Sequence, residues 1–282
     1  MRIVKRIFAS IALVAYASIC HAAENNALSW LYNNDVASFN RYFDGIQRGF
    51  ESGSVSEVDL RNAYRPIYML DATGAKNLTI WAEGAPRSYV AHLALGIYLK
   101  KLGEKVRGEK FVEETPVEKL TEAESYFTRA NRELSKSLSL TSKPYLSIFH
   151  MLSIAAWMGE RSNAGTLLTA ANKMVPSNAL ARCRFVKILL PRWGGSYGEA
   201  DAFIAATQKE GVAPGIIYQL QAIKEDDIGH TLASKGDHAA ANEHFVRALQ
   251  LAERSGGTVS SDWLQTSRYF ICRNGSAVSY CQ

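Results

Sequence analysis

One spacing of small and large apolar residues occurs twice in this chain and constrains its fold more than any other feature. After Gly236 and after Gly159, small residues follow at offsets five and twelve and a large apolar residue at offset nine. These residues are Ala241, Phe245 and Ala248, and Ala164, Leu168 and Ala171. The spacing is typical of a helical hairpin: glycine allows the turn, small residues let two helices approach, and the large residue fills the space between them. Because such a hairpin buries its apolar face by stacking on neighbours, the pattern predicts an all-α helical-repeat fold.

The glycines expected in the turns of these hairpins recur at a near-constant interval. Gly159, Gly195 and Gly236 lie 36 and 41 residues apart, whereas Gly103 precedes Gly159 by 56 residues. The excess is explained if the charged residues 104–119 form an insertion of about sixteen residues in the turn of an earlier hairpin, where extra length costs little. Such an insertion lies either near a binding face, as in many solenoids, or in an ordinary solvated loop.

Two further segments complete the single helical-repeat domain that we expect over residues 23–282. Residues 71–87 contain two glycines and a proline, which predict a loop that carries Trp81. Residues 260–282 are expected to cap the last of about five hairpins.

Two resemblances agree with this organisation. The spacing over 229–251, and also over 152–176, resembles the tetratricopeptide repeat. The box Pro-Arg-Trp-Gly-Gly-Ser-Tyr at 191–197 resembles one in an uncharacterised bacterial family of helical repeats. Further residues similar to that family's middle portion are Trp81, Pro86, Ala91, Gly96, Arg107 and Gly108. The resemblances imply a tetratricopeptide-like α-solenoid, and they bring no known activity or functional residue.

The first residues, 1–22, are typical of a secretory signal peptide. Three basic residues among the first six precede an uncharged run over 7–19, and cleavage is expected near Ala22 or Ala23. The run is shorter than the roughly 20 residues that a transmembrane helix needs. Lipid attachment at Cys20 is the alternative, which the bulky residue before it disfavours. We therefore expect a periplasmic or secreted protein with no membrane span after cleavage.

Signal cleavage also changes the charge. Residues 1–22 contain three of the 32 Lys and Arg residues and none of the 27 Asp and Glu residues, so the rest of the chain has 29 against 27, a net charge of +2. Nucleic-acid binding needs a clustered basic face. This balance therefore argues against nucleic acid as a partner.

Three cysteines remain after cleavage. Cys272 and Cys281 flank a turn-forming stretch, and we expect them to form a disulfide, the alternative being two thiols in a loose tail. Cys183 lies on an expected helix and is interpreted as a buried small apolar residue.

One segment matches the sequence pattern of a hydrolase nucleophile. Residues 194–198 read Gly-Gly-Ser-Tyr-Gly, which matches the nucleophile elbow around Ser196. That elbow requires a preceding strand, and Pro191 disfavours one. Ser196 is better explained as a helix N-cap whose capping box is completed by Glu199.

No cofactor or metal is expected from the motifs. His238 and His244 are six residues apart, which does not place them on one helical face, and His230 is expected on the other helix of the hairpin. No phosphate-binding loop or dinucleotide fingerprint is present in the sequence.

The aromatic residues near the expected turns suggest a binding function. Trp and Tyr, together with Arg, are common anchors at protein interfaces, and the candidate partner-binding residues are Arg192, Trp193, Tyr197 and Trp81. We expect a non-catalytic protein- or peptide-binding scaffold of the bacterial envelope. Alternatives are a serine hydrolase that uses Ser196, a toxin-neutralising protein and a cell-wall-binding protein.

Overall fold

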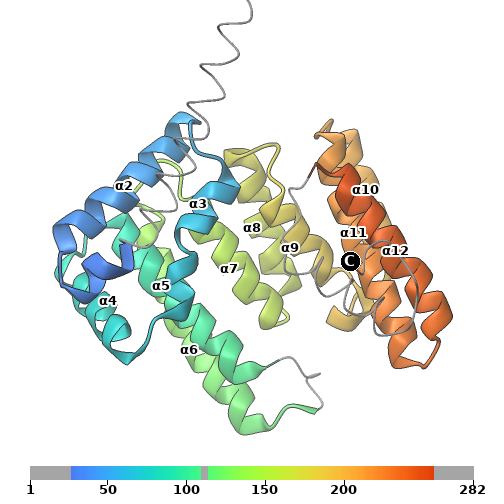
Figure 1. Ribbon diagram of the computed structural model, residues 1–282, viewed down its shortest axis with the longest axis horizontal. Coiled ribbons are helices and arrows are strands. Elements are labelled where there is room, and N and C mark those ends of the chain that lie inside the picture. Colours follow the sequence, from blue (N-terminus) through green and yellow to red (C-terminus); the bar gives the residue numbers. More distant parts are fainter. Residues whose placement is uncertain (1–26, 109–113, 257–282) are drawn as a thin grey trace, which may run out of the picture. The chain divides into compact units, whose positions relative to one another are not determined.

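The computed structural model describes residues 27–108 and 114–256, and the regular structure in these ranges is helical throughout (Figure 1). The predicted all-α class is therefore confirmed for the described residues. The expected signal peptide at 1–22, the Cys272–Cys281 disulfide and the cap over 260–282 lie outside them. None of the described helices is both long and apolar enough to cross a membrane.

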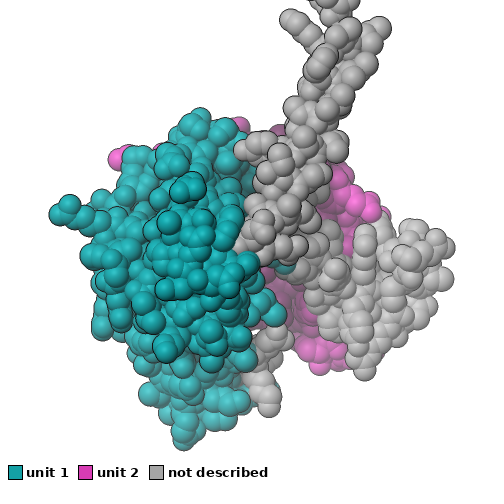
Figure 2. Space-filling view, turned by 60° about the vertical axis from the view of Figure 1, so that its left-hand side comes forward, with its two compact units in different colours: residues 1–154 teal, residues 155–282 magenta. Residues whose placement is uncertain are grey.

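The chain divides into two compact units, an N-terminal unit of residues 1–154 and a C-terminal unit of residues 155–282 (Figure 2). The N-terminal unit begins with a short helix over residues 27–32. It continues with α2 (Val36–Ser52), α3 (Glu57–Ala63), the 3-10 helix η1 (Arg65–Met69), α4 (Ala72–Gly84), α5 (Tyr89–Arg107), α6 (Val117–Ser137) and most of α7 (Tyr145–Trp157). Those of the C-terminal unit are α8 (Arg161–Met174), α9 (Leu180–Ile188), the 3-10 helix η3 (Pro191–Trp193), α10 (Tyr197–Lys209), α11 (Pro214–Ser234) and α12 (His238–Arg254).

The hairpin α11/α12 has the geometry that its sequence predicts. Gly236 adopts φ 84° in the turn, and Ala241, Phe245 and Ala248 are all fully buried. A Cβ atom on Gly229 of α11 would lie 2.6 Å from the Phe245 ring, so this position requires a residue without a side chain. The turn expected near Gly159 is also confirmed, with φ 71°.

The hairpin α5/α6 differs from its prediction at Gly103. This glycine is inside α5 and not in a turn, and a Cβ atom there would lie 2.6 Å from the Phe127 ring of α6. Helix α5 continues to Arg107, and Gly108 has the positive φ, 68°. The expected insertion at 104–119 is therefore partly helical, because it lengthens α5 at one end and includes the start of α6 at the other.

The prediction of a loop over 71–87 is wrong, because residues 72–84 form α4. Asp71 caps the helix by accepting a hydrogen bond from the Gly74 amide at 2.9 Å. Gly74 is in the first turn, where a Cβ atom would lie 2.9 Å from the Tyr32 hydroxyl, and Gly84 is the last helical residue. The two glycines that suggested a loop thus mark a close contact and a helix end.

Candidate functional site

The Pro191–Tyr197 segment, called here the box turn, is a sharply defined connection between α9 and α10. Residues 191–193 form η3, and Gly194 follows with φ 79°. A Cβ atom on Gly195 would lie 2.1 Å from the Leu189 carbonyl oxygen, so only glycine fits beneath that backbone. The predicted turn is therefore confirmed, with the positive φ at Gly194.

Ser196 ends the box turn as the N-cap of α10. Its hydroxyl accepts a hydrogen bond from the Glu199 amide at 3.2 Å and donates one to the Glu199 carboxylate at 3.2 Å. The N-cap prediction is confirmed. A 3-10 turn, and no strand, precedes Ser196, so the strand–turn–helix context of a nucleophile elbow is not found here.

Helix α8 fixes the outer side of the box turn. Arg161 donates to the Gly194 carbonyl at 3.1 Å and to the Glu199 carboxylate at 2.6 Å. The ring of Trp193 meets that of Trp157 edge to face, with centroids 5.1 Å apart and planes at 70°. Such a pair contributes about 0.5–1.5 kcal/mol beyond its buried area.

The inner side of the box turn is anchored on a buried carboxylate of α11. Asp227 is 1% exposed, and it is paired with the Arg192 guanidinium. The Tyr197 hydroxyl donates to Asp227 at 3.1 Å and lies 3.2 Å from the Thr231 hydroxyl. Burial raises the pKa of Tyr197, and the negative charge of Asp227 raises it further. Arg192 and Tyr197, two of the predicted binding residues, thus both bind Asp227.

A group of charged residues lies where α9 packs against α11, beside Asp227. Asp226 and His230 are one turn apart on α11 and 3.6 Å from each other. Lys187 of α9 interacts electrostatically with Asp226, and His230 interacts with Lys187. Burial lowers the pKa of His230, although Asp226 opposes that shift.

Three of the four predicted binding residues lie together, and the fourth lies in the core of the N-terminal unit. Arg192, Trp193 and Tyr197 lie together in the box turn, and Trp193 and Tyr197 are partly buried. Trp81 lies in the N-terminal unit, 3% exposed, with its ring edge-on to Phe39 at 4.8 Å between centroids. Trp81 is a core residue in this structure, and we do not retain it as a binding residue.

Sequence reasoning missed Lys187 and gave Asp227 no anchoring role. The signal for Lys187 is a single charge inside the apolar run Phe-Val-Lys-Ile-Leu-Leu at 185–190. Asp227 offers no local signal, because its partner Arg192 is 35 residues away in sequence. Cys183, expected to be buried and apolar, is partly buried and lies 3.4 Å from the Gln219 side-chain oxygen.

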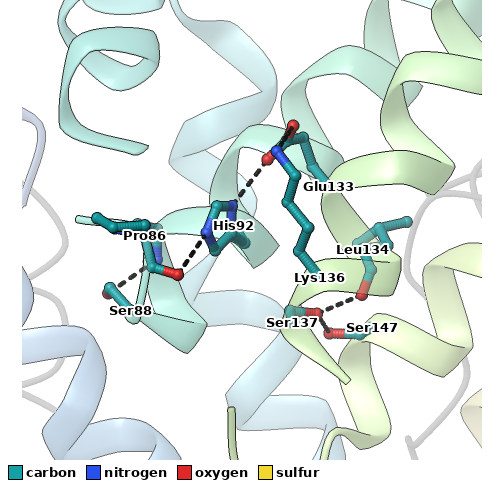
Figure 3. A network of polar contacts seen from close by, with 9 residues as sticks. Pro86, Ser88, His92, Glu133, Leu134, Lys136, Ser137 and Ser147 are labelled. Atoms are coloured by element: carbon teal, nitrogen blue, oxygen red, sulfur yellow. Dashed lines mark hydrogen bonds and ion pairs between the residues drawn. The ribbon is translucent and has the colours of Figure 1, made fainter. Parts of the chain in front are cut away.

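A second polar network lies between α5 and α6 of the N-terminal unit (Figure 3). His92 is 4% exposed, with Nδ1 2.7 Å from the Glu133 carboxylate and Nε2 3.2 Å from the Pro86 carbonyl oxygen. Both partners are acceptors when Glu133 is ionised, so this geometry favours a ring that donates from both nitrogens. Lys136 also binds Glu133, at 2.8 Å.

The described residues contain no group of three or more His, Cys, Asp or Glu side chains arranged to hold a metal ion. Comparison of the whole chain with known protein families and with curated proteins found no match.

Proposed function

We propose that this chain is a non-catalytic, periplasmic or secreted scaffold that binds a protein or peptide through the box turn. The proposal includes a tetratricopeptide-like α-solenoid of about five hairpins with a C-terminal cap. The repeated glycine–phenylalanine contacts in α5/α6 and α11/α12 support this arrangement. The basic start and uncharged run of residues 1–22 support export.

The observation that carries the proposal is the rigid presentation of Arg192 and Trp193. The box turn is tied to α8 through Arg161 and to α11 through Asp227. The Arg192 side chain remains 39% exposed although it is paired. Arg and Trp are enriched among the residues that contribute most to interfaces, and groups held in place before binding lose less entropy on association.

The role of Ser196 supports a scaffold over a hydrolase. Its oxygen accepts the Glu199 amide, and its proton is directed to the Glu199 carboxylate. The hydrogen bond from Arg161 lowers the pKa of the Glu199 carboxyl, which makes this carboxylate a weaker base than a nucleophilic serine requires. We therefore propose a structural role for Ser196.

Photocrosslinking in living bacteria tests the proposal. A photoreactive amino acid replaces Gly198, an exposed residue in the first turn of α10 whose nearest neighbour to an added Cβ is the Ser196 hydroxyl at 3.8 Å. The matched control replaces Gly45, an exposed glycine of α2 with nothing within 4 Å of an added Cβ. Both substitutions add a large side chain to a helix surface that has room for it.

The expected result is one dominant protein adduct at position 198 and none at position 45, with its identity determined by mass spectrometry. A toxin as the adduct would select the toxin-neutralising alternative within the proposal. A glycan adduct in place of a protein would select cell-wall binding and contradict it. Equal labelling at both positions, or none at either, would also count against a binding site at the box turn.

A further inference from the structure

Lys187 is a partly buried cation without an acceptor in the described part of the chain. It lies near the end of α9, and the neighbouring Val186 and Ile188 are buried. Its ammonium group makes no hydrogen bond and no ion pair with any other described residue. An ammonium group has three hydrogen-bond donors, and leaving them unmet away from bulk water is costly.

The charges around Lys187 have both signs, and none of the described carboxylates forms an ion pair with it. Arg184 on the same helix and Arg192 in η3 both repel it. Asp226 attracts it but also lies 3.6 Å from His230. Asp227 is already bound by Arg192 and by the Tyr197 hydroxyl.

These surroundings change the basicity of Lys187. Burial, together with the positive charge of Arg184, lowers the pKa of the ammonium to about 8 against the opposing effect of Asp226. An added negative charge close to the ammonium group would reverse this shift. The site therefore favours an anion as its missing partner.

We propose that Lys187, flanked by Arg184 and Arg192, binds a carboxylate of an acidic peptide segment in the partner protein. This inference rests on the proposed function and specifies the chemistry of that partner. Trp193 follows Arg192 in sequence and is partly buried against the apolar cluster that includes Val186 and Leu190. The partner segment then combines acidic and apolar side chains.

Peptide binding to the full chain, after removal of residues 1–22, tests the inference. The probe is a fluorescein-labelled octaglutamate peptide, and an octaglutamine peptide with the same label is its uncharged counterpart. Lys187→Met removes the charge, and Lys187→Arg retains it. Lys173→Met is the matched control, because Lys173 is an exposed lysine of α8 and its loss changes the net charge equally.

The wild-type chain is expected to bind octaglutamate and not octaglutamine. Lys187→Met should weaken binding by about tenfold or more, as expected for the loss of one charge-assisted hydrogen bond. Lys173→Met should change it by less than about twofold, since an exposed, distant charge is screened by salt. Equal losses in both variants, equal binding of the two peptides, or no binding of octaglutamate would overturn the inference.

A second measurement reads the lysine directly and does not depend on affinity. After reductive ¹³C-methylation, the NMR signal of Lys187 is assigned by its absence in Lys187→Arg and titrated with pH. Addition of octaglutamate should raise the pKa of Lys187 from about 8. The other ionisable groups that act on it are Arg184, Arg192, Cys183, Asp226 and His230. An unchanged pKa with bound peptide would contradict contact between the carboxylate and Lys187.

Crosslinking at Gly198 separates this inference from the proposed function. If the adduct is formed equally well in the Lys187→Met background, the scaffold proposal stands and the acidic-partner inference fails. If wild type gives no adduct, the scaffold proposal itself fails. Unchanged circular dichroism and melting temperature in Lys187→Met would show that a lost adduct reflects recognition and not unfolding.

Discussion

The hairpins α5/α6 and α11/α12 share a steric contact but arrange their polar contacts in opposite ways. In each, a glycine of the first helix leaves room for a phenylalanine ring of the second, Gly103 for Phe127 and Gly229 for Phe245. The histidine of the polar pair that joins the two helices is on the first helix in α5/α6, as His92. In α11/α12 it is on the second helix, as His244.

The capping of the helices follows the same reversal. Ser88 caps α5, and Asp237 caps α12, each by accepting a backbone amide hydrogen bond. Helices α6 and α11 have no side-chain hydrogen bond at their N-caps. In each hairpin, the helix with the capping side chain also has the histidine that pairs with a glutamate of the other helix. The close approach of two helices thus fixes glycine on the first helix and phenylalanine on the second. The histidine of a polar pair, in contrast, can lie on either helix.

The largest expected effect comes from removing the shared rings. Phe127 and Phe245 are 2% and 0% exposed. Phe127→Ala and Phe245→Ala should each lower the free energy of unfolding by about 3–5 kcal/mol, because each leaves a cavity beside a glycine that cannot fill it. Urea denaturation followed by circular dichroism measures both. If the free energy of unfolding is unchanged at either position, the phenylalanine there does not stabilise its hairpin as proposed.

Filling the glycine positions tests the same contact from the other helix. A Cβ atom at Gly103 or Gly229 would lie 2.6 Å from the phenylalanine ring, so Gly103→Ala and Gly229→Ala should each destabilise by about 1–3 kcal/mol through overpacking. Gly45→Ala is the control, because its Cβ meets nothing within 4 Å and alanine favours a helix by roughly 0.5–1 kcal/mol. The melting temperature should therefore fall in Gly103→Ala and Gly229→Ala and rise in Gly45→Ala.

The polar pair in α5/α6 predicts how the stability of this hairpin responds to acid. Burial raises the pKa of Glu133, but hydrogen bonds from Lys136 and His92 outweigh it, so the net shift is downward. A lowered pKa stabilises the fold at neutral pH, and this stabilisation is lost as the pH falls through the folded-state pKa.

Glu133→Gln should cost about 2 kcal/mol at neutral pH, since it removes charge-assisted hydrogen bonds to His92 and Lys136, and it should flatten the acid limb of stability. Glu225→Gln should cost less, about 1 kcal/mol or below, because its histidine partner is more exposed, His244 at 23% against 5% for His92. The cations in the two pairs, Arg247 at 53% and Lys136 at 50%, are similarly exposed. Urea unfolding at pH values from 3 to 7 measures both. An equal cost at neutral pH would show that burial of the histidine makes no difference, and an unchanged acid limb in Glu133→Gln would contradict the role of its carboxylate.

The comparison also explains which features the sequence could predict. The offsets after Gly236 predicted the burial of Ala241, Phe245 and Ala248, because α11/α12 has a short turn and the register continues across it. The prediction of a turn at Gly103 was wrong, because α5 continues to Arg107. The turn therefore lies beyond the glycine that faces the Phe127 ring.

The polar site was less predictable for a different reason. Residues three or four apart in sequence are neighbours on a helix, so their contact can be predicted from spacing alone. The contact between Ser196 and Glu199 was predicted in this way. Asp227 joins Arg192 across 35 residues and two helices, and no periodic pattern connects them. Lys187 was visible as an isolated charge, but its lack of an acceptor is a property of the packed helices.

The smallest effects are expected at the two reversed caps. Ser88 accepts the Ala91 amide at 3.2 Å, and Asp237 accepts the Ala240 amide at 3.1 Å. Replacement of either by alanine should cost about 1 kcal/mol. Ser88→Thr and Asp237→Asn retain an accepting oxygen, and each should recover most of its loss. Hydrogen exchange of the first-turn amides gives a local measurement, in which Ser88→Ala should speed exchange in α5 and Asp237→Ala in α12. Because α6 and α11 begin without such caps, their first-turn amides should not change; faster exchange there would mean that the caps stabilise the hairpins as wholes and not the helices that they begin.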